Sequence, residues 1–128
     1  MGSVSTSDIL ILIALLQVKH ALCDGPLQTY AMIKEKGYYG RPGGIIHAAI
    51  HGAGSLGVLL FFGIAALPAL ALAGIEMLLH YHIDFIKETI ARRFAWTYDR
   101  AQFWWALMAD QMLHQLTYLA MAFAVLSI

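Results

Sequence analysis

Four long apolar segments fill most of this 128-residue chain, and only short polar stretches connect them. The segments cover roughly residues 8–24, 44–66, 69–93 and 101–128. A helix rises about 1.5 Å per residue, so about 20 apolar residues cross the roughly 30 Å hydrocarbon core of a bilayer. The first segment, at roughly 25 Å, is the shortest. The pattern predicts an all-α integral membrane protein, a four-helix bundle with a short first helix.

The composition indicates that lipid covers the apolar surface of these segments. Hydrophobic residues make up 60% of the chain and charged residues 12%, whereas a soluble domain carries about a quarter charged residues. The formal net charge of zero excludes the overall basic field by which nucleic-acid-binding proteins attract their ligand. We therefore expect residues 1–128 to form a single transmembrane domain that contacts the bilayer and binds no nucleic acid.

The distribution of basic residues predicts the orientation in the membrane. Residues 28–41 and 88–100 contain most of the cations, namely Lys34, Lys36, Arg41, Arg92, Arg93 and Arg100. With a tight turn at Leu67-Pro68, both basic connections lie on one side of a four-span protein. Short loops rich in Lys and Arg stay in the cytoplasm, so we expect both termini on the non-cytoplasmic side.

Histidine and aspartate follow a regular spacing. The chain has six histidines and five aspartates. Eight of these eleven residues form four pairs whose members are four residues apart, one pair in each segment. The pairs are His20 with Asp24, His47 with His51, His80 with Asp84, and Asp110 with His114. Residues at i and i+4 lie on the same face of a helix. Although neighbouring helices run in opposite directions, all four pairs fall in the half near the basic loops, so we expect them to meet there.

Two interpretations fit this convergence. Ionisable groups at the bilayer centre cost roughly 2.5–3.5 kcal/mol each on insertion scales, so they are usually retained for a reason. One interpretation is a hydrogen-bonded network in which each histidine donates to an aspartate and holds the helices together. The other, which we favour, is a two-metal centre with all eight residues as ligands. Zinc is the expected metal, with iron or manganese as alternatives.

Further residues are expected to assist the ligands. Gln28, Glu76 and Gln111 are placed to orient them from outside. Either Asp110 or Asp84 would bridge the ions. Both are expected to serve in catalysis together with Lys87, which lies near the cytoplasmic end of its segment.

Four more residues have weaker signals. Lys19, with Lys87 and Arg41, would receive an anionic group at the cytoplasmic mouth, although extension of a lysine to the interface explains its position as well. Cys23 lies about 100° from Asp24 around an ideal helix and is expected to pack. His82 is displaced by about 200° from His80 and is expected to face headgroups or a neighbour.

Four ordered motifs carry a resemblance to a known family. They are His20-x-x-x-Asp24 followed by Pro26-Leu27-Gln28, His47-x-x-x-His51, His80-x-x-Ile83-Asp84-x-x-Lys87, and Asp110-Gln111-x-x-His114. Together they resemble an uncharacterised family of small bacterial and phage membrane proteins, known as domain of unknown function 3307, over nearly the whole chain. The resemblance implies a family pattern and a bacterial inner membrane location, and it implies no activity.

The site predicts a metal-dependent hydrolase of a lipid or another amphiphile at the cytoplasmic leaflet, because bound metals polarise acyl or phosphoryl oxygens and generate hydroxide. A non-haem di-iron oxidase would use the same ligands. Non-enzymatic alternatives are an accessory or scaffold subunit of a larger membrane complex, an oligomer, or a metal sensor or carrier. Residues 56–73 contain no ionisable group, which argues against a route through the membrane.

Overall fold

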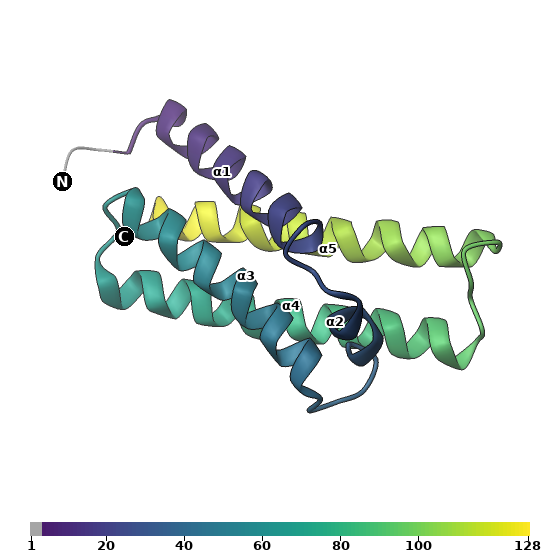
Figure 1. Cartoon of the computed structure of the whole chain (residues 1–128). Helices are drawn as coiled ribbons and strands as arrows, with labels where there is room; N and C mark the ends of the chain where they lie inside the picture. Colours follow the sequence, from purple (N-terminus) through teal and green to yellow (C-terminus); the bar gives the residue numbers. More distant parts are fainter. Residues whose placement is uncertain (1–3) are drawn as a thin grey trace.

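The computed structural model describes residues 4–128, and this part of the chain contains helices and no strand. The helices are α1 (Thr6–Asp24), α2 (Tyr30–Glu35), α3 (Pro42–Phe61), α4 (Ala66–Arg93) and α5 (Ala101–Val125) (Figure 1). The all-α prediction is confirmed. The structure adds the short helix α2 inside the first basic connection.

The start of α1 is fixed by a reciprocal cap. The Ser5 hydroxyl accepts a hydrogen bond from the Asp8 amide at 3.1 Å, and the Asp8 carboxylate accepts one from the Ser5 amide at 2.9 Å. This arrangement satisfies amide groups that have no partner in the first helical turn. The cap extends α1 to Thr6, slightly before the expected start at residue 8.

The turn between α3 and α4 differs from the expected one. The sequence predicted a break at Leu67-Pro68, but α3 ends at Phe61 and α4 begins at Ala66. Gly63 adopts φ +77° in this turn, a conformation that glycine takes without steric cost. Pro68 lies in the first turn of α4, where its missing amide hydrogen would have had no helical partner.

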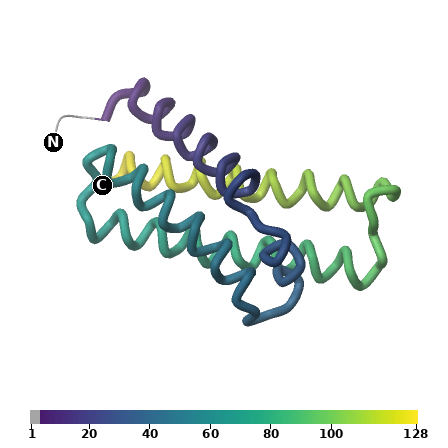
Figure 2. The backbone as a smooth tube through the Cα atoms, in the orientation of Figure 1, coloured from purple at the N-terminus to yellow at the C-terminus, as the bar shows by residue number. Residues whose placement is uncertain are grey.

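The four long helices pack as a cycle of neighbours. α1 contacts α3 and α5, and α4 also contacts α3 and α5, while α2 packs against α3. The backbone trace shows that α1 ends near the middle of the longer pair α4 and α5 (Figure 2). The half of the molecule that holds the two basic connections therefore consists mainly of α4, α5, the start of α3 and the α2 segment.

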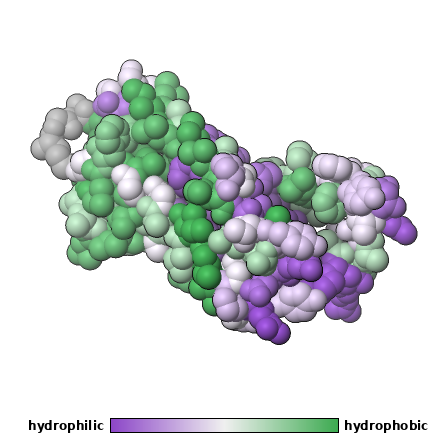
Figure 3. Space-filling view, in the orientation of Figure 1, coloured by the Kyte–Doolittle hydropathy of each residue, from purple (hydrophilic) through white to green (hydrophobic). Residues whose placement is uncertain are grey.

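Apolar and polar side chains occupy opposite ends of the molecule. The end with the α3–α4 turn and the start of α1 is covered by hydrophobic side chains, and hydrophilic ones gather over the α2 end (Figure 3). Inside the apolar end lies a buried cluster made of Leu12, Leu16, Leu59, Ile64, Ala69, Tyr118, Met121, Ala122 and Val125.

Three helices, α1, α3 and α4, are long and apolar enough to cross a membrane. They indicate a membrane protein. α5 has 25 residues, but it is not among these three spans, because its tryptophans, glutamines and the Asp110–His114 pair lower its hydropathy. The fourth span and the side on which the termini lie stay predictions.

Close packing of α3 on α4 depends on a glycine. A Cβ atom added to Gly52 would lie 3.0 Å from the Met77 Cβ and 3.4 Å from the Ala73 carbonyl oxygen. Gly57, one and a half turns further along α3, faces open space. Small residues of this kind let helices approach closely in lipid.

We predict that Gly52→Leu lowers the free energy of unfolding by about 1–3 kcal/mol, because the new side chain must separate α3 from α4. Denaturation in mixed micelles, followed by circular dichroism, measures this loss. The matched Gly57→Leu variant should unfold like the parent. Equal behaviour of the two variants would contradict the close-packed seam.

Candidate metal centre

Each long helix contributes one histidine–carboxylate or histidine–histidine pair to a shared interior site. Seven of the eight side chains that the spacing singled out are buried: His20, His47, His51, His80, Asp84, Asp110 and His114. The Asp24 side chain is 21% exposed, which makes this carboxylate the point where the site reaches the surface. The structure thus brings together the four pairs that lie far apart in the sequence.

The tighter of two ligand groups contains Asp24, His47, His51 and His80, whose candidate ligand atoms all lie within 4.8 Å of one another. The Asp24 Oδ1 atom lies 3.0 Å from His51 Nε2 and 3.1 Å from His47 Nε2. His47 Nε2 is also 3.1 Å from His80 Nε2. Three imidazole nitrogens and one carboxylate oxygen therefore face a common point.

A second group contains His80, Asp84 and His114. Asp84 Oδ2 lies 3.3 Å from His80 Nε2, and Asp84 Oδ1 lies 3.3 Å from His114 Nε2. Asp110 stands at the edge of this group, with its Oδ1 atom 3.4 Å from His114 Nε2. His20 lies outside both groups, with its Nε2 atom 3.1 Å from Asp24 Oδ2.

One ring nitrogen of the site lies close to several partners at once. His47 Nε2 has His80 Nε2, Asp24 Oδ1 and Asp84 Oδ2 within 3.4 Å, but a neutral ring nitrogen offers either one hydrogen or one lone pair. Tetrahedral ligands at the usual zinc–nitrogen distance of about 2.0–2.1 Å lie about 3.3 Å apart. The observed spacings of 3.0–3.4 Å match this ligand separation and overlap the hydrogen-bond range, so these groups could hold a metal ion.

Tyr118 orients His20, and packing orients two other rings. The Tyr118 hydroxyl lies 2.9 Å from His20 Nδ1. By contrast, His47 Nδ1 and His80 Nδ1 are buried without a hydrogen-bond partner among the described residues. The His80 ring instead stacks between the rings of His51 and His114, at centroid distances of 3.6 and 4.0 Å.

Lys19 lies inside the site rather than at the cytoplasmic mouth, which corrects the expectation from the sequence. Its side chain is 7% exposed, and Nζ lies 3.3 Å from Glu76 Oε1 and 2.9 Å from the Tyr118 hydroxyl. The reason is local packing: the lysine stem crosses Gly54, where a Cβ atom would come within 2.7 Å of Lys19 Cγ. The absence of a side chain on this glycine gives the lysine its route inward.

Lys36 is a site residue that the sequence analysis did not single out. Its Nζ atom lies 2.9 Å from Asp84 Oδ2, and its side chain is 6% exposed. Lys36 caps the C-terminus of α2, and the next residue, Gly37, accepts a hydrogen bond from Arg92 at 2.6 Å. A side chain at Gly37 would collide with Arg92 and Glu88, so this glycine lets the α2 segment close over the site.

The three predicted supporting residues contact the centre in different ways. The Gln111 amide donates to Asp24 Oδ2 and to Asp110 Oδ2, at 3.2 Å in both cases. Gln28 donates to the Asp24 backbone carbonyl at 2.8 Å. Glu76 accepts from the Ser55 hydroxyl at 3.2 Å and lies beside Lys19.

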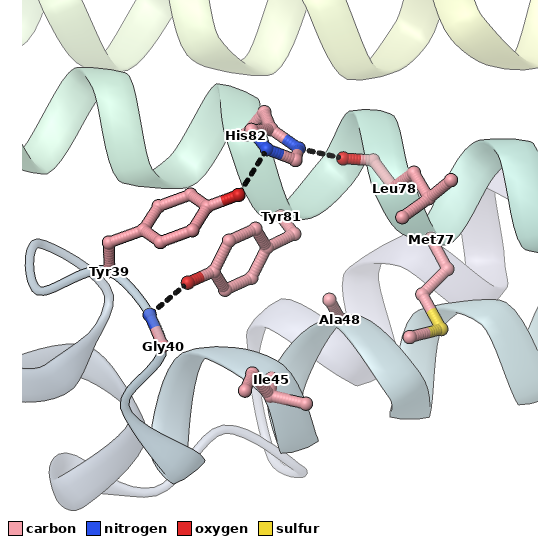
Figure 4. A pocket seen from close by; sticks show the side chains of 8 residues that line it. All are labelled: Tyr39, Gly40, Ile45, Ala48, Met77, Leu78, Tyr81 and His82. Carbon is pink, nitrogen blue, oxygen red and sulfur yellow. Dashed lines mark hydrogen bonds between the residues drawn. The ribbon is translucent and has the colours of Figure 1, made fainter.

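The remaining candidates make other contacts. Lys87 forms an ion pair with Glu88 at 2.6 Å, Arg41 is exposed, and Cys23 is buried. His82 is exposed on the outer face of α4, where its ring lies 3.1 Å from the Tyr39 hydroxyl and 2.7 Å from the Leu78 carbonyl oxygen (Figure 4).

Comparison with known proteins adds one finding. A family described as "Protein of unknown function (DUF3307)" matches residues 11–128, which confirms the resemblance inferred from the motifs. No curated protein and no solved structure matches the chain.

We predict that Lys19→Met lowers the free energy of unfolding by about 3–5 kcal/mol, because Glu76 then keeps a buried charge without its partner. Chemical denaturation in detergent measures the loss. The double variant Lys19→Met with Glu76→Gln should recover part of it, since both charges are gone. Lys34→Met, at an exposed position of α2, serves as the control and should change stability by less than about 0.5 kcal/mol.

Proposed function

Because the chain belongs to the DUF3307 family, whose function is unknown, we propose its function from the buried site. We propose that it is a membrane-embedded metalloenzyme that hydrolyses a lipid or another amphiphile at the cytoplasmic leaflet of a bacterial inner membrane. One observation carries this proposal: three imidazole nitrogens and one carboxylate oxygen converge on a single point among apolar helices.

The group of Asp24, His47, His51 and His80 is the first metal position. Mixed imidazole and carboxylate ligation without thiolate suits zinc, manganese or non-haem iron. The partly exposed Asp24 provides the side from which water reaches the ion.

The geometry favours one ion, although the sequence predicted two. The His80 Nε2 atom contacts members of both ligand groups, at 3.1 Å from His47 Nε2 and 3.3 Å from Asp84 Oδ2. A neutral imidazole nitrogen has one lone pair and binds one ion. The Lys36 ammonium, 2.9 Å from Asp84 Oδ2, already supplies a positive charge at the second group.

The charges of the interior side chains also favour one ion. The interior holds four carboxylates, Asp24, Glu76, Asp84 and Asp110, and two ammonium groups, Lys19 and Lys36. With neutral histidines, four negative and two positive charges leave a net charge of minus two. One divalent ion neutralises this charge, whereas two ions would leave an excess of two positive charges in a low-dielectric interior.

In a hydrolase the residues around the ion have separate tasks. A bound divalent metal supplies an activated water and polarises the bond to be cleaved. Asp110, whose Oδ1 atom lies 3.4 Å from His114 Nε2 and has no hydrogen-bond partner among the described residues, would hold a proton released at the site. Lys36 and Lys19 place positive charge near the developing oxyanion, and Lys87 and Arg41 attract an anionic head group from the rim.

A second candidate follows from the number of ligands. Zinc held by four protein ligands is closed, whereas catalytic zinc retains an open position. An octahedral iron with the same four ligands keeps two open positions, as oxygen-activating iron requires. Iron in the purified protein would therefore favour the oxidase alternative, and zinc with three of the four ligands would favour hydrolysis.

The non-enzymatic alternatives gain less support from the structure. A scaffold or accessory subunit does not need converging ligand atoms. A metal carrier needs polar groups along the whole path, but the buried cluster at the other end of the bundle is built from apolar residues and Tyr118.

We predict that the purified protein retains about one equivalent of zinc, iron or manganese, measured by elemental analysis after gentle detergent extraction. His51→Ala and Asp24→Asn should lose the metal, because each removes a ligand and the variants remain membrane-inserted. His82→Ala, which changes an exposed histidine outside the site, should keep it. Metal-free wild type after reconstitution would overturn the proposal and leave a hydrogen-bonded network.

The count of ions is tested by Lys36→Met in the same assay. Removing this ammonium frees Asp84 and should raise the metal content toward two equivalents. Two equivalents in the wild type would restore the two-metal prediction.

We also propose that α5 forms the fourth span and that the basic connections lie in the cytoplasm. In a Cys23→Ala background, a membrane-impermeant maleimide added to spheroplasts should label Ser127→Cys and spare Lys34→Cys. The positive-inside rule is the reason for this expectation. Labelling of Lys34→Cys alone would mean that the orientation is reversed.

A further inference from the structure

An apolar groove of about 300 Å³ runs along the outer seam between α4 and α5. Its walls are aliphatic: Ile83, Ile86 and Ile90 from α4, and Ala106, Ala109 and Leu113 from α5. Trp96, in the connection between the two helices, also lines it. These positions repeat every three or four residues, so each helix contributes one continuous stripe.

The groove exists because other helices leave this flank uncovered. α1 contacts α5 through the opposite flank, where His20 meets Gln111 and Tyr118. α2 packs on α3, and the residues that follow it, Lys36 and Gly37, meet α4 at Asp84 and Arg92. As a result Ile86 is 54% exposed and Ile90 is 38% exposed, although both lie near the basic end of α4.

The groove also touches the candidate metal centre. Asp110 lines it, is 4% exposed, and has an Oδ1 atom without a hydrogen-bond partner among the described residues. The same atom lies 3.4 Å from His114 Nε2, which lies 3.3 Å from Asp84 Oδ1. One carboxylate therefore separates an apolar surface from the buried ligand groups.

We propose that this groove binds the acyl chain of an anionic lipid, the substrate of the enzyme proposed above, on which this inference rests. A chain lying along the isoleucine and alanine stripes replaces bilayer contacts with protein contacts over its whole length. Its polar end then meets Lys87, which lines the same groove, near the basic last turn of α4, where Arg93 follows Ile90 by three residues on the same helix face. Ligand sites of this volume typically combine apolar walls with a few polar groups.

The test uses Trp96 as a reporter of the groove. In a Trp104→Phe, Trp105→Phe background Trp96 is the sole tryptophan, and its fluorescence is followed while dibrominated phosphatidylglycerol is titrated into detergent-solubilised protein. We expect saturable quenching. Ala109→Phe, which fills the groove, should weaken the apparent affinity by at least about tenfold, or about 1.4 kcal/mol.

Controls make this result specific. Met112→Phe adds a ring at a neighbouring exposed position of α5 that does not line the groove, and it should bind lipid like the parent. Lys87→Gln should weaken phosphatidylglycerol more than phosphatidylcholine, because only the former carries the net negative charge. Unchanged quenching in Ala109→Phe would overturn the acyl-chain site.

Two further outcomes separate this inference from the metal proposal. Lipid quenching in His51→Ala should persist although its metal is lost, since the groove does not need the ion. A wild-type protein that holds no metal after reconstitution but still shows saturable quenching would reject the enzyme and keep the lipid site. If a second copy of the chain fills the groove, light scattering will show a dimer that Ala109→Phe dissociates, and lipid will not quench Trp96. That result would overturn the lipid assignment.

Discussion

The burial of carboxylates among apolar helices is the constraint on which the rest of the structure depends. An ionised carboxylate away from water is unstable unless cations and hydrogen-bond donors surround it. Asp24 collects three imidazole nitrogens at 3.0–3.1 Å. Asp84 collects three imidazoles at 3.3–3.4 Å and the Lys36 ammonium. The packing of α1, α3, α4 and α5 around a single point meets this requirement and leaves groups that could hold a metal ion.

Small residues let the charged groups reach one another. Gly54 makes room for the Lys19 stem, Gly37 lets the α2 segment approach α4, and Gly52 brings α3 close to α4. Each glycine thus lets neighbouring segments lie close enough for the charged side chains to meet at the site. Gly52 and Gly54 both lie in α3. Their close contacts with α4 and Lys19 account for glycine in this strongly apolar helix.

Much of this site follows from periodicity, and part of it does not. The i, i+4 spacing placed eight residues on inward faces, and the same stripe one turn further leads from His114 to Tyr118 and from His51 to Ser55, so these two contacts were accessible from the sequence. Lys36 was not, because its burial depends on how an irregular connection folds back over α3. The turn at Gly63 was also misplaced, since Pro68 reads as a helix breaker unless the first helical turn is recognised. The side of the membrane on which the termini lie cannot be read from contacts within the protein.

The origin of the ligands has a consequence for biogenesis. The tighter group takes Asp24 from α1, His47 and His51 from α3, and His80 from α4, and α5 contributes none of the four. A chain that enters the membrane from its N-terminus as it is synthesised therefore presents the complete set before α5 has left the ribosome. With the proposed metal bound there, ion capture would precede insertion of the final helix, and the supply of metal during translation would influence how much protein matures.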